Sequence, residues 1–198
     1  MMDKNELARD LRACVLLFIV VCVLSIVYTL FINWSTQTIM PYQANGSLLY
    51  MNGTVVGSEL IGQNFTSQGY FHGRPSAVNY AGNNSGGSNY GPTSAALMEQ
   101  VRQRIEKVII ENGLPSNATV PADLVLASGS GLDPHISVAS AFLQVPRVAK
   151  ARELPETDVR ALVDQLIEPP QFGIFGQERV NVLKLNIALD ELAVSRKR

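Results

Sequence analysis

The sequence of 198 residues predicts a mixed α/β (α+β) fold, in which a single N-terminal transmembrane helix precedes a compact extracytoplasmic domain. Two observations lead to this prediction: one long apolar segment lies near the N-terminus, and helical and strand-like patterns alternate in the C-terminal half. Both cysteines, Cys14 and Cys22, fall in the apolar segment, so the outer domain is expected to fold without disulfides. A net charge of −1 provides no large basic field, which excludes a nucleic-acid-binding role.

The apolar segment runs from Ala13 to Ile32, and fourteen of its residues are Val, Leu, Ile or Phe. A helix of this length spans about 30 Å, the thickness of a bilayer core. The alternative is a cleaved signal peptide, whose apolar region would be shorter and would precede a small-residue cleavage site. The sequence NWSTQTIMPYQ follows instead, which favours a retained anchor with Trp34 at the membrane interface.

The distribution of basic residues predicts the orientation of this anchor. Lys4, Arg9 and Arg12 precede the segment, and the next basic residue is Arg74. Because positive residues stay on the cytoplasmic side, the N-terminus is expected inside the cell. The expected organisation of this single-pass cell-membrane protein is a cytoplasmic N-terminus, a transmembrane helix and an extracytoplasmic domain, covering residues 1–12, 13–32 and 33–198.

The region from Asn33 to Met98 carries only two charged residues, Glu59 and Arg74. It is either a flexible spacer or a surface that packs against a partner or against the rest of the domain. Its six aromatic residues after position 49 argue against a disordered linker, and protein interfaces lose charge and gain aromatic residues. The candidate partner contacts in this region are Tyr70, Phe71, His72, Arg74, Pro75 and Ser76.

Local patterns predict the elements of the outer domain. Asn52-Gly53 between apolar runs predicts a hairpin with a type I′ turn. Residues 94–112 form an amphipathic helix that Gly113 ends. The elements expected after it are a strand at 123–128, a helix that starts just after Pro134 and continues beyond Pro146, a helix at 155–168 with Pro155 at its first position, a strand at 179–185 and a helix at 186–194.

The sequence ASGSGLDPHIS, residues 127–137, resembles a reactive loop. A phosphate-binding loop needs a lysine, which is absent near it, and Pro134 occupies the place of the third glycine in a dinucleotide fingerprint. Its Ser, Asp and His residues lie close in sequence, whereas a catalytic triad draws its members from separate loops. The chain has only two histidines and no carboxylate cluster beside them, which disfavours a metal site.

A structural interpretation fits this loop best. Asp133 can cap the first turn of the helix that follows, with Pro134 at its first position. Gly129 and Gly131 permit the positive φ angles that a sharp exit from the preceding strand requires.

Four motifs appear in a fixed order: GYFHGRPSAVNY, SGGSNYGPTS, ASGSGLDPHIS with VPRVAKAR, and FGIFGQERVNVLKLN. With the single N-terminal span, they resemble the C-subunit family of Kdp-type potassium-transporting ATPases over essentially the whole chain. One residue departs from the family pattern: Val138 stands where a proline often follows HIS, which bears on the start of that helix.

The resemblance implies a non-catalytic subunit of an ATP-driven potassium uptake pump. Its implied partners are a P-type ATPase subunit with the phosphorylation site, a channel-like subunit with the selectivity filter, and a small single-span subunit. The family is described as an assembly factor or catalytic chaperone that raises the ATP affinity of the ATPase subunit. Its nucleotide-related region corresponds here to Ser128, Gly129, Ser130, Gly131, Leu132, Asp133, Pro134 and His135.

The resemblance implies no cofactor bound directly by this chain, since the complex handles ATP and potassium. The predicted topology places residues 128–135 outside the cell, which favours an indirect effect on ATP affinity over direct contact. The residues alone leave one alternative open: a membrane-anchored extracytoplasmic binding or hydrolytic domain unrelated to transport.

Overall fold

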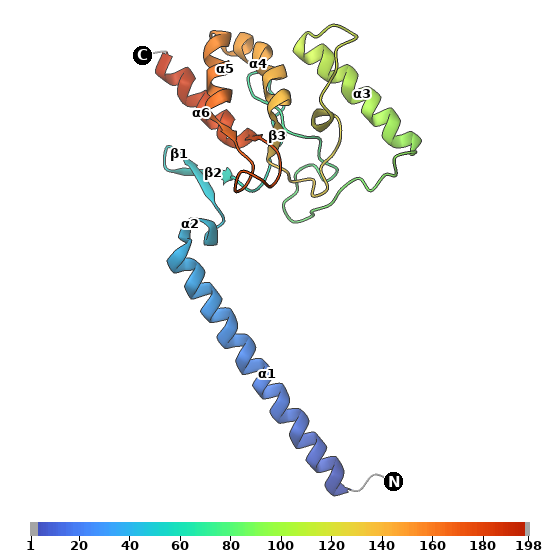
Figure 1. Cartoon of the computed structure of the whole chain (residues 1–198), viewed down its shortest axis with the longest axis vertical. Helices are drawn as coiled ribbons and strands as arrows, with labels where there is room; N and C mark the ends of the chain where they lie inside the picture. Colours follow the sequence, from blue (N-terminus) through green and yellow to red (C-terminus); the bar gives the residue numbers. More distant parts are fainter. Residues whose placement is uncertain (1–3, 197–198) are drawn as a thin grey trace. The chain divides into compact units, whose positions relative to one another are not determined.

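The computed structural model describes residues 4–196 and divides into two units, Met1–Ser47 and Leu48–Arg198 (Figure 1). Residues 1–3 of the expected cytoplasmic N-terminus and residues 197–198 of the expected outer domain lie outside the described part. Each unit is described by itself.

The first unit consists of α1 (Lys4–Ile39) and the short α2 (Pro41–Ala44). With 36 residues, α1 is about 54 Å long and exceeds the thickness of a bilayer core. It is the one helix in the described residues that is long and apolar enough to cross a membrane, which is consistent with a single-pass anchor. Thr29 donates to the carbonyl of Ser25 at 2.8 Å, so its hydroxyl is satisfied within the helix.

The second unit begins with an antiparallel hairpin of β1 (Leu48–Met51) and β2 (Thr54–Ser58). The two turn residues, Asn52 and Gly53, have φ angles of 51° and 78°. Positive φ at both positions is the requirement of a type I′ turn, so the predicted hairpin is confirmed.

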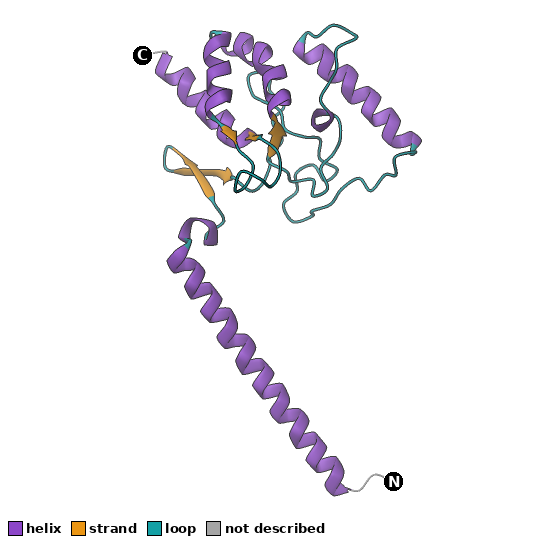
Figure 2. Cartoon of the chain, viewed as in Figure 1, coloured by secondary structure: helices purple, strands orange, loops and turns teal. Residues whose placement is uncertain are grey.

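The remainder of the second unit is a small antiparallel sheet with helices (Figure 2). The strand order is β3-β5-β4, with β5 in the centre. The strands are β3 (His135–Ser137), β4 (Ile167–Glu168) and β5 (Arg179–Asn181). The helices are α3 (Ala95–Asn112), the 3₁₀ turn η1 (Ala122–Leu124), α4 (Val138–Arg152), α5 (Glu156–Gln165) and α6 (Val182–Arg196). This architecture confirms the predicted mixed fold class.

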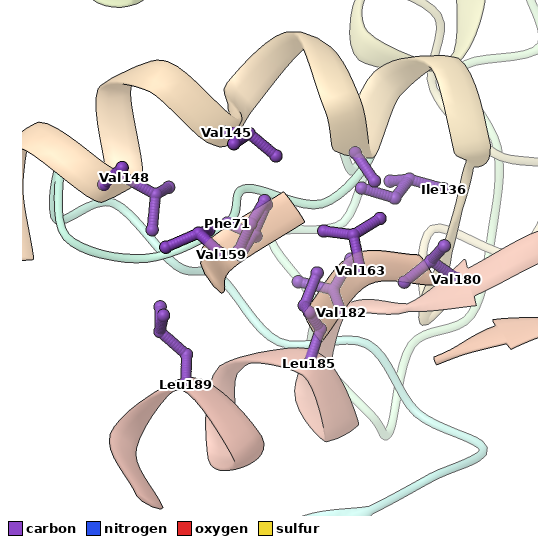
Figure 3. Packing of buried hydrophobic residues seen from close by; sticks show 12 residues of the cluster. Phe71, Ile136, Val145, Val148, Val159, Val163, Val180, Val182, Leu185 and Leu189 are labelled. Carbon is purple, nitrogen blue, oxygen red and sulfur yellow. The ribbon is translucent and has the colours of Figure 1, made fainter. Parts of the chain in front are cut away.

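The hydrophobic core lies between α4, α5, α6 and the small sheet (Figure 3). In α4 the apolar positions Ala141, Val145 and Val148 recur at helical spacing and are completely buried. Figure 3 shows side chains from α4, α5 and α6 pointing toward one another. Phe71 enters this core from the segment between β2 and α3 and is also 0% exposed.

The predicted start and end of α3 are confirmed. Ser94 is its N-cap and accepts a hydrogen bond from the backbone N–H of Leu97, and Gly113 follows with a φ of 62°. Both residues match the predicted start and stop. The prediction that the chain stays helical beyond Pro146 is also confirmed, since α4 runs through it.

The strand predicted at 123–128 is wrong. The segment forms η1 followed by a loop, although Leu124 and Val125 are buried. The Asp123 carboxylate accepts hydrogen bonds from the Ser137 backbone N–H at 2.7 Å and from the Ser140 hydroxyl at 2.7 Å. This side chain therefore anchors the segment to the start of α4. A β-strand would instead need backbone hydrogen bonds to a neighbouring strand.

The helix predicted just after Pro134 starts later, because residues 135–137 form β3. The N-cap of α4 is Ser137, whose hydroxyl accepts from the Ser140 N–H at 3.1 Å, so the predicted cap at Asp133 is wrong. Pairing with β5 overrides the helical pattern here.

Two further boundaries differ from the prediction. The helix predicted at 155–168 is α5, with Pro155 as its N-cap, and its predicted last residues form β4. The strand predicted at 179–185 is limited to β5, because α6 begins at Val182. Asn181 starts that helix by accepting the Lys184 backbone N–H at 3.1 Å.

Candidate functional site

The segment Ser128–His135, called the locked loop below, is tied to three distant parts of the chain through its carbonyl groups. The carbonyl of Ser130 accepts from the Gly86 N–H at 2.8 Å, and that of Leu132 accepts from the Gly62 N–H at 2.7 Å. The carbonyl of Pro134 accepts from the Val182 N–H at 2.9 Å. These bonds hold the loop in place before β3 begins.

The side chains of the locked loop bind mainly within the loop itself. The Ser128 hydroxyl accepts the Gly131 N–H at 2.9 Å, and the Ser130 hydroxyl accepts the Leu132 N–H at 3.1 Å. The Asp133 carboxylate accepts the His135 N–H at 3.0 Å. The serine hydroxyls therefore stabilise turns of the backbone.

Only one of the two glycines in the locked loop has the expected positive φ. Gly131 has a φ of 67°, and a Cβ added there would lie 2.6 Å from Val78 and 2.7 Å from the Gly86 carbonyl. Gly129 does not have a positive φ, and a Cβ added there would meet nothing within 4 Å. The prediction for Gly129 is wrong, because the tight approach occurs at Gly131 alone.

Asp133 connects the locked loop to the GYFHGRPS motif. Its Oδ2 accepts from the Arg74 Nη1 at 2.9 Å, in a partly exposed ion pair. Burial by itself raises the pKa of Asp133, but hydrogen bonds from His135 and Arg74 outweigh burial and leave it below the ordinary value. The carboxylate therefore stays ionised at neutral pH.

A chain of ionisable side chains continues from Asp133 across the sheet. The His135 ring lies 3.6 Å from Asp133 and 3.4 Å from Glu168. The Lys184 ammonium then bridges Glu168, at 3.1 Å, and Glu59, at 2.7 Å. Burial raises the pKa of Glu168, but the hydrogen bond and charge of Lys184 outweigh burial and lower it. This ion-pair network joins strand, helix and loop segments that are far apart in sequence.

The segment Gly69–Ser76, called the clamped segment below, is fixed through its backbone by side chains of α4 and α6. Asn186 accepts from the Phe71 N–H at 2.9 Å and donates to the Phe71 carbonyl at 3.0 Å. Gln144 does the same for His72, at 2.8 and 3.1 Å. The two amide side chains thus bind the extended backbone as a neighbouring strand would.

The side chain of Arg147 also holds the clamped segment, and it is only 7% exposed. Its guanidinium donates to the carbonyls of Gln68, at 2.5 Å, and Tyr70, at 3.0 Å. It also donates to the side chains of Asn112, at 2.9 Å, and Gln144, at 2.7 Å. Burial lowers the pKa of Arg147, and the four acceptors replace the water that the charge has lost.

The predicted partner-contact residues occupy different environments. Phe71 belongs to the core, and the Tyr70 hydroxyl donates to Asp190 at 3.0 Å beneath the Arg152 guanidinium. The Ser76 hydroxyl donates to the Gly131 carbonyl at 2.7 Å and so joins the two motifs. The predicted residues that line a polar cavity of about 210 Å³ between this segment and α3 are His72, Arg74, Pro75 and Ser76.

Charged and titratable side chains line this cavity. Arg74, Arg104 and Lys107 line it together with Glu111 and His72. Burial lowers the pKa of His72 below its ordinary value of 6.5, and the charge of Arg147 lowers it further, so its imidazole is neutral at pH 7. Within residues 4–196, no group of three or more His, Cys, Asp or Glu side chains is placed to hold a metal ion.

Comparisons with known proteins identify one family that matches most of this chain. Residues 11–191 match the family model described as "K+-transporting ATPase, c chain". The chain belongs to the KdpC family. It is 49% identical over 191 residues to the potassium-transporting ATPase KdpC subunit of Gemmatimonas aurantiaca, covering 94% of this chain and 95% of that protein. The corresponding subunit of Rhodospirillum rubrum is 51% identical over 187 residues, covering 92% and 96%. The chain is therefore a subunit of the Kdp potassium-transporting ATPase complex.

The sequence motifs identified the loops but missed the groups that hold them. Gln144, Arg147 and Asn186 are buried polar residues that fix the clamped segment. One signal was present in the sequence, because Gln144 and Arg147 interrupt the apolar stripe of α4 on its buried side. A polar residue in a buried stripe needs a partner, but the sequence does not say which.

Proposed function

We propose that the chain is a non-catalytic accessory subunit that stabilises the assembled pump and raises the ATP affinity of its P-type ATPase subunit. Its other proposed partners are the channel-like subunit and the small single-span subunit, and the complex handles ATP and potassium. The observation that carries this proposal is the locked loop, whose hydroxyl, carboxylate and carbonyl groups bind the chain's own backbone and Arg74. Such a loop supports a rigid docking domain more readily than a nucleotide site.

The proposed topology has a cytoplasmic N-terminus at residues 1–12, a membrane helix at 13–32 and an extracytoplasmic domain at 33–198. Its support is the excess of Lys and Arg before the apolar segment. In this orientation the locked loop and cytoplasmic ATP lie on opposite sides of the membrane. The effect on ATP affinity then acts through the conformational equilibrium of the pump, because a subunit that binds one conformation more tightly increases its population.

The first test measures ATP affinity in the assembled pump. The complex is purified in mild detergent with and without this chain, and potassium-stimulated ATPase activity is measured over a range of ATP concentrations. A higher KM for ATP in the complex without the chain is the expected result. Equal KM values in assembled complexes with and without the chain would refute the role in ATP affinity.

A second test measures topology. Ser130 is exposed, so a Ser130→Cys variant in a background without Cys14 and Cys22 can be labelled with a membrane-impermeant maleimide in intact cells. Glu6→Cys in the same background is the matched control, because Glu6 is exposed near the N-terminal end of α1. We expect labelling at 130 and none at 6 until the cells are opened. The reverse pattern would place the locked loop in the cytoplasm and restore direct ATP contact.

A further inference from the structure

The connection between β4 and β5 forms a second, tight hairpin at residues 170–176, called the apolar hairpin below. Gln171 and Phe175 exchange two backbone hydrogen bonds, both 2.9 Å long. The N–H of Gly173 donates to the Pro170 carbonyl at 3.0 Å, and that of Ile174 donates to the Gln171 carbonyl at 3.1 Å. These bonds fix the shape of the hairpin, so its side chains are presented in a defined arrangement.

Three bulky apolar side chains of this hairpin lie in solvent. Phe172 is 91% exposed, Ile174 is 78% exposed and Phe175 is 65% exposed. For comparison, the large apolar side chains of α1, which lipid is expected to cover, reach at most 77%. All residues from 171 to 178 are exposed. A cluster of this kind on an ordered hairpin indicates an interaction site.

The backbone of the hairpin turns at two residues with positive φ angles. Phe172 has a φ of 54°, a left-handed conformation that is uncommon for a bulky residue. Gly173 follows with a φ of 73° and tolerates it without strain. The two residues form the tip of the hairpin, where the N–H of Ile174 donates to the Gln171 carbonyl.

The chemistry around the hairpin distinguishes a protein partner from a lipid surface. Segments that bind at a membrane interface combine apolar residues with Lys, Arg, Trp or Tyr, and residues 169–178 contain none of these four types. Arg179, the nearest cation, lies 3.3 Å from Glu168, whereas Glu178 is exposed and would be repelled by anionic headgroups. The surface therefore fits an apolar pocket of a protein that carries a cation at its rim.

We propose that the apolar hairpin docks into an apolar pocket on another subunit of the same transport complex, with Phe172 and Ile174 inside and Glu178 facing a cationic side chain at the rim. The partner is a pump subunit because the chain belongs to a subunit family of such a complex. This identification of the partner rests on the proposed function.

Photocrosslinking in the assembled complex tests which molecule covers the hairpin. Benzoylphenylalanine replaces Phe172 in one variant, Ile174 in a second and Val194 in a control, since Val194 is an exposed apolar residue of α6 at 57% exposure. We expect positions 172 and 174 to crosslink to one and the same pump subunit, and position 194 to crosslink much less. Crosslinks to lipid only, crosslinks to a second copy of this chain only, or no crosslinks would each overturn the proposal.

A double variant tests the energetic contribution of the hairpin. Phe172→Asn with Ile174→Ser removes the two apolar groups proposed to enter the pocket, and Asn tolerates the left-handed conformation, so the hairpin is preserved. After dilution of the purified complex in mild detergent, we expect this variant to dissociate at least about tenfold faster than the wild type. Glu178→Lys should dissociate several-fold faster, because the like charges at the rim repel. Wild-type dissociation rates in both variants would overturn the proposal.

The two proposals fail in distinguishable ways. If the wild-type chain does not co-purify with the other pump subunits at all, the proposed accessory function fails. If the wild-type chain co-purifies and the hairpin variants dissociate equally slowly, the accessory function stands and only the docking surface is lost. The thermal unfolding midpoint of each variant chain, measured in micelles, should be no lower than that of the wild type, which shows that the variant is folded.

Discussion

The locked loop and the apolar hairpin adjoin the same three-stranded sheet. The first bonds its side chains within the chain, whereas the second exposes them to solvent. The locked loop is rich in reactive residue types, but its hydroxyl and carboxylate groups bind its own chain. The apolar hairpin contains no reactive side chain, yet it exposes Phe172 and Ile174 almost completely. The comparison teaches that side chains left without contacts in their own chain indicate an external partner better than the residue types of a segment do.

The small sheet explains how both features are positioned. β3 begins at His135, where the locked loop ends, and pairs with β5, while the apolar hairpin joins β4 to β5. Core residues Ile136 and Val180, 2% and 0% exposed, hold this sheet against the helices. The clamped segment contributes Phe71 to the same core and is held by the buried amide groups of Gln144 and Asn186.

The largest effect is expected where the clamped segment depends on one buried charge. Arg147→Ala should lower the free energy of unfolding by about 3 kcal/mol, because four acceptors lose their donor inside the protein. Urea unfolding of the full chain in micelles, followed by circular dichroism, measures the change.

Lys150→Ala is the matched control, because Lys150 is exposed on the same helix. Its free energy of unfolding should stay within about 0.5 kcal/mol of the wild type. Equal losses for Arg147→Ala and Lys150→Ala would mean that helix α4 is sensitive to any truncation and that the clamp contributes nothing specific.

The two glycines of the locked loop give the next largest effect and the sharpest contrast. Gly131→Ala should cost about 2 kcal/mol, since its φ is positive and a Cβ would approach Val78 and the Gly86 carbonyl too closely. Gly129→Ala should cost less than about 0.5 kcal/mol, because its Cβ would enter open space. The same unfolding measurement compares them, and an equal cost at both positions would contradict the close packing of the loop at Gly131.

Features that depend on neighbouring residues were predictable from the sequence. The caps of α3 and the Asn52-Gly53 turn were correct, because hydrogen bonds and φ preferences within a few residues decide them. That α1 is long and apolar enough to cross a membrane follows from composition in the same way.

Features that depend on distant partners were not predictable from a single sequence. Residues 123–128 have a strand-like composition, but the contact of Asp123 with Ser137 fixes a different structure. Residues 135–137 become β3 because β5 pairs with them from more than forty positions away. For the site, the motifs located both loops, whereas the clamps by Gln144 and Asn186 arise only when α4 and α6 pack on either side of the clamped segment.

A smaller, pH-dependent effect is expected at the junction of the two motifs. Asp133→Asn should lower the free energy of unfolding by about 1 kcal/mol at pH 7, because the ion pair with Arg74 is partly exposed. The pKa of Asp133 is below its ordinary value of 3.8 in the folded chain. The stability that the carboxylate contributes is therefore complete above 3.8 and is lost as the pH falls through the lowered pKa.

Urea unfolding of the wild type and of Asp133→Asn at a series of pH values measures this dependence. The difference between them should shrink as the wild-type carboxylate becomes protonated. A difference that stays constant down to the acid end would assign the effect to the shape of the side chain and not to its charge.

The smallest effect on folding is expected at the apolar hairpin, where the effect on assembly should be large. Phe172→Asn leaves the free energy of unfolding unchanged or raises it by less than about 1 kcal/mol, because Asn adopts the left-handed conformation more easily than Phe. The Phe172 ring is 91% exposed, so its removal leaves no cavity. A loss of more than about 1 kcal/mol in the isolated chain would show that the ring packs against its own domain, as core residues do. The contrast with the locked loop would then disappear, because both segments would be held by internal contacts.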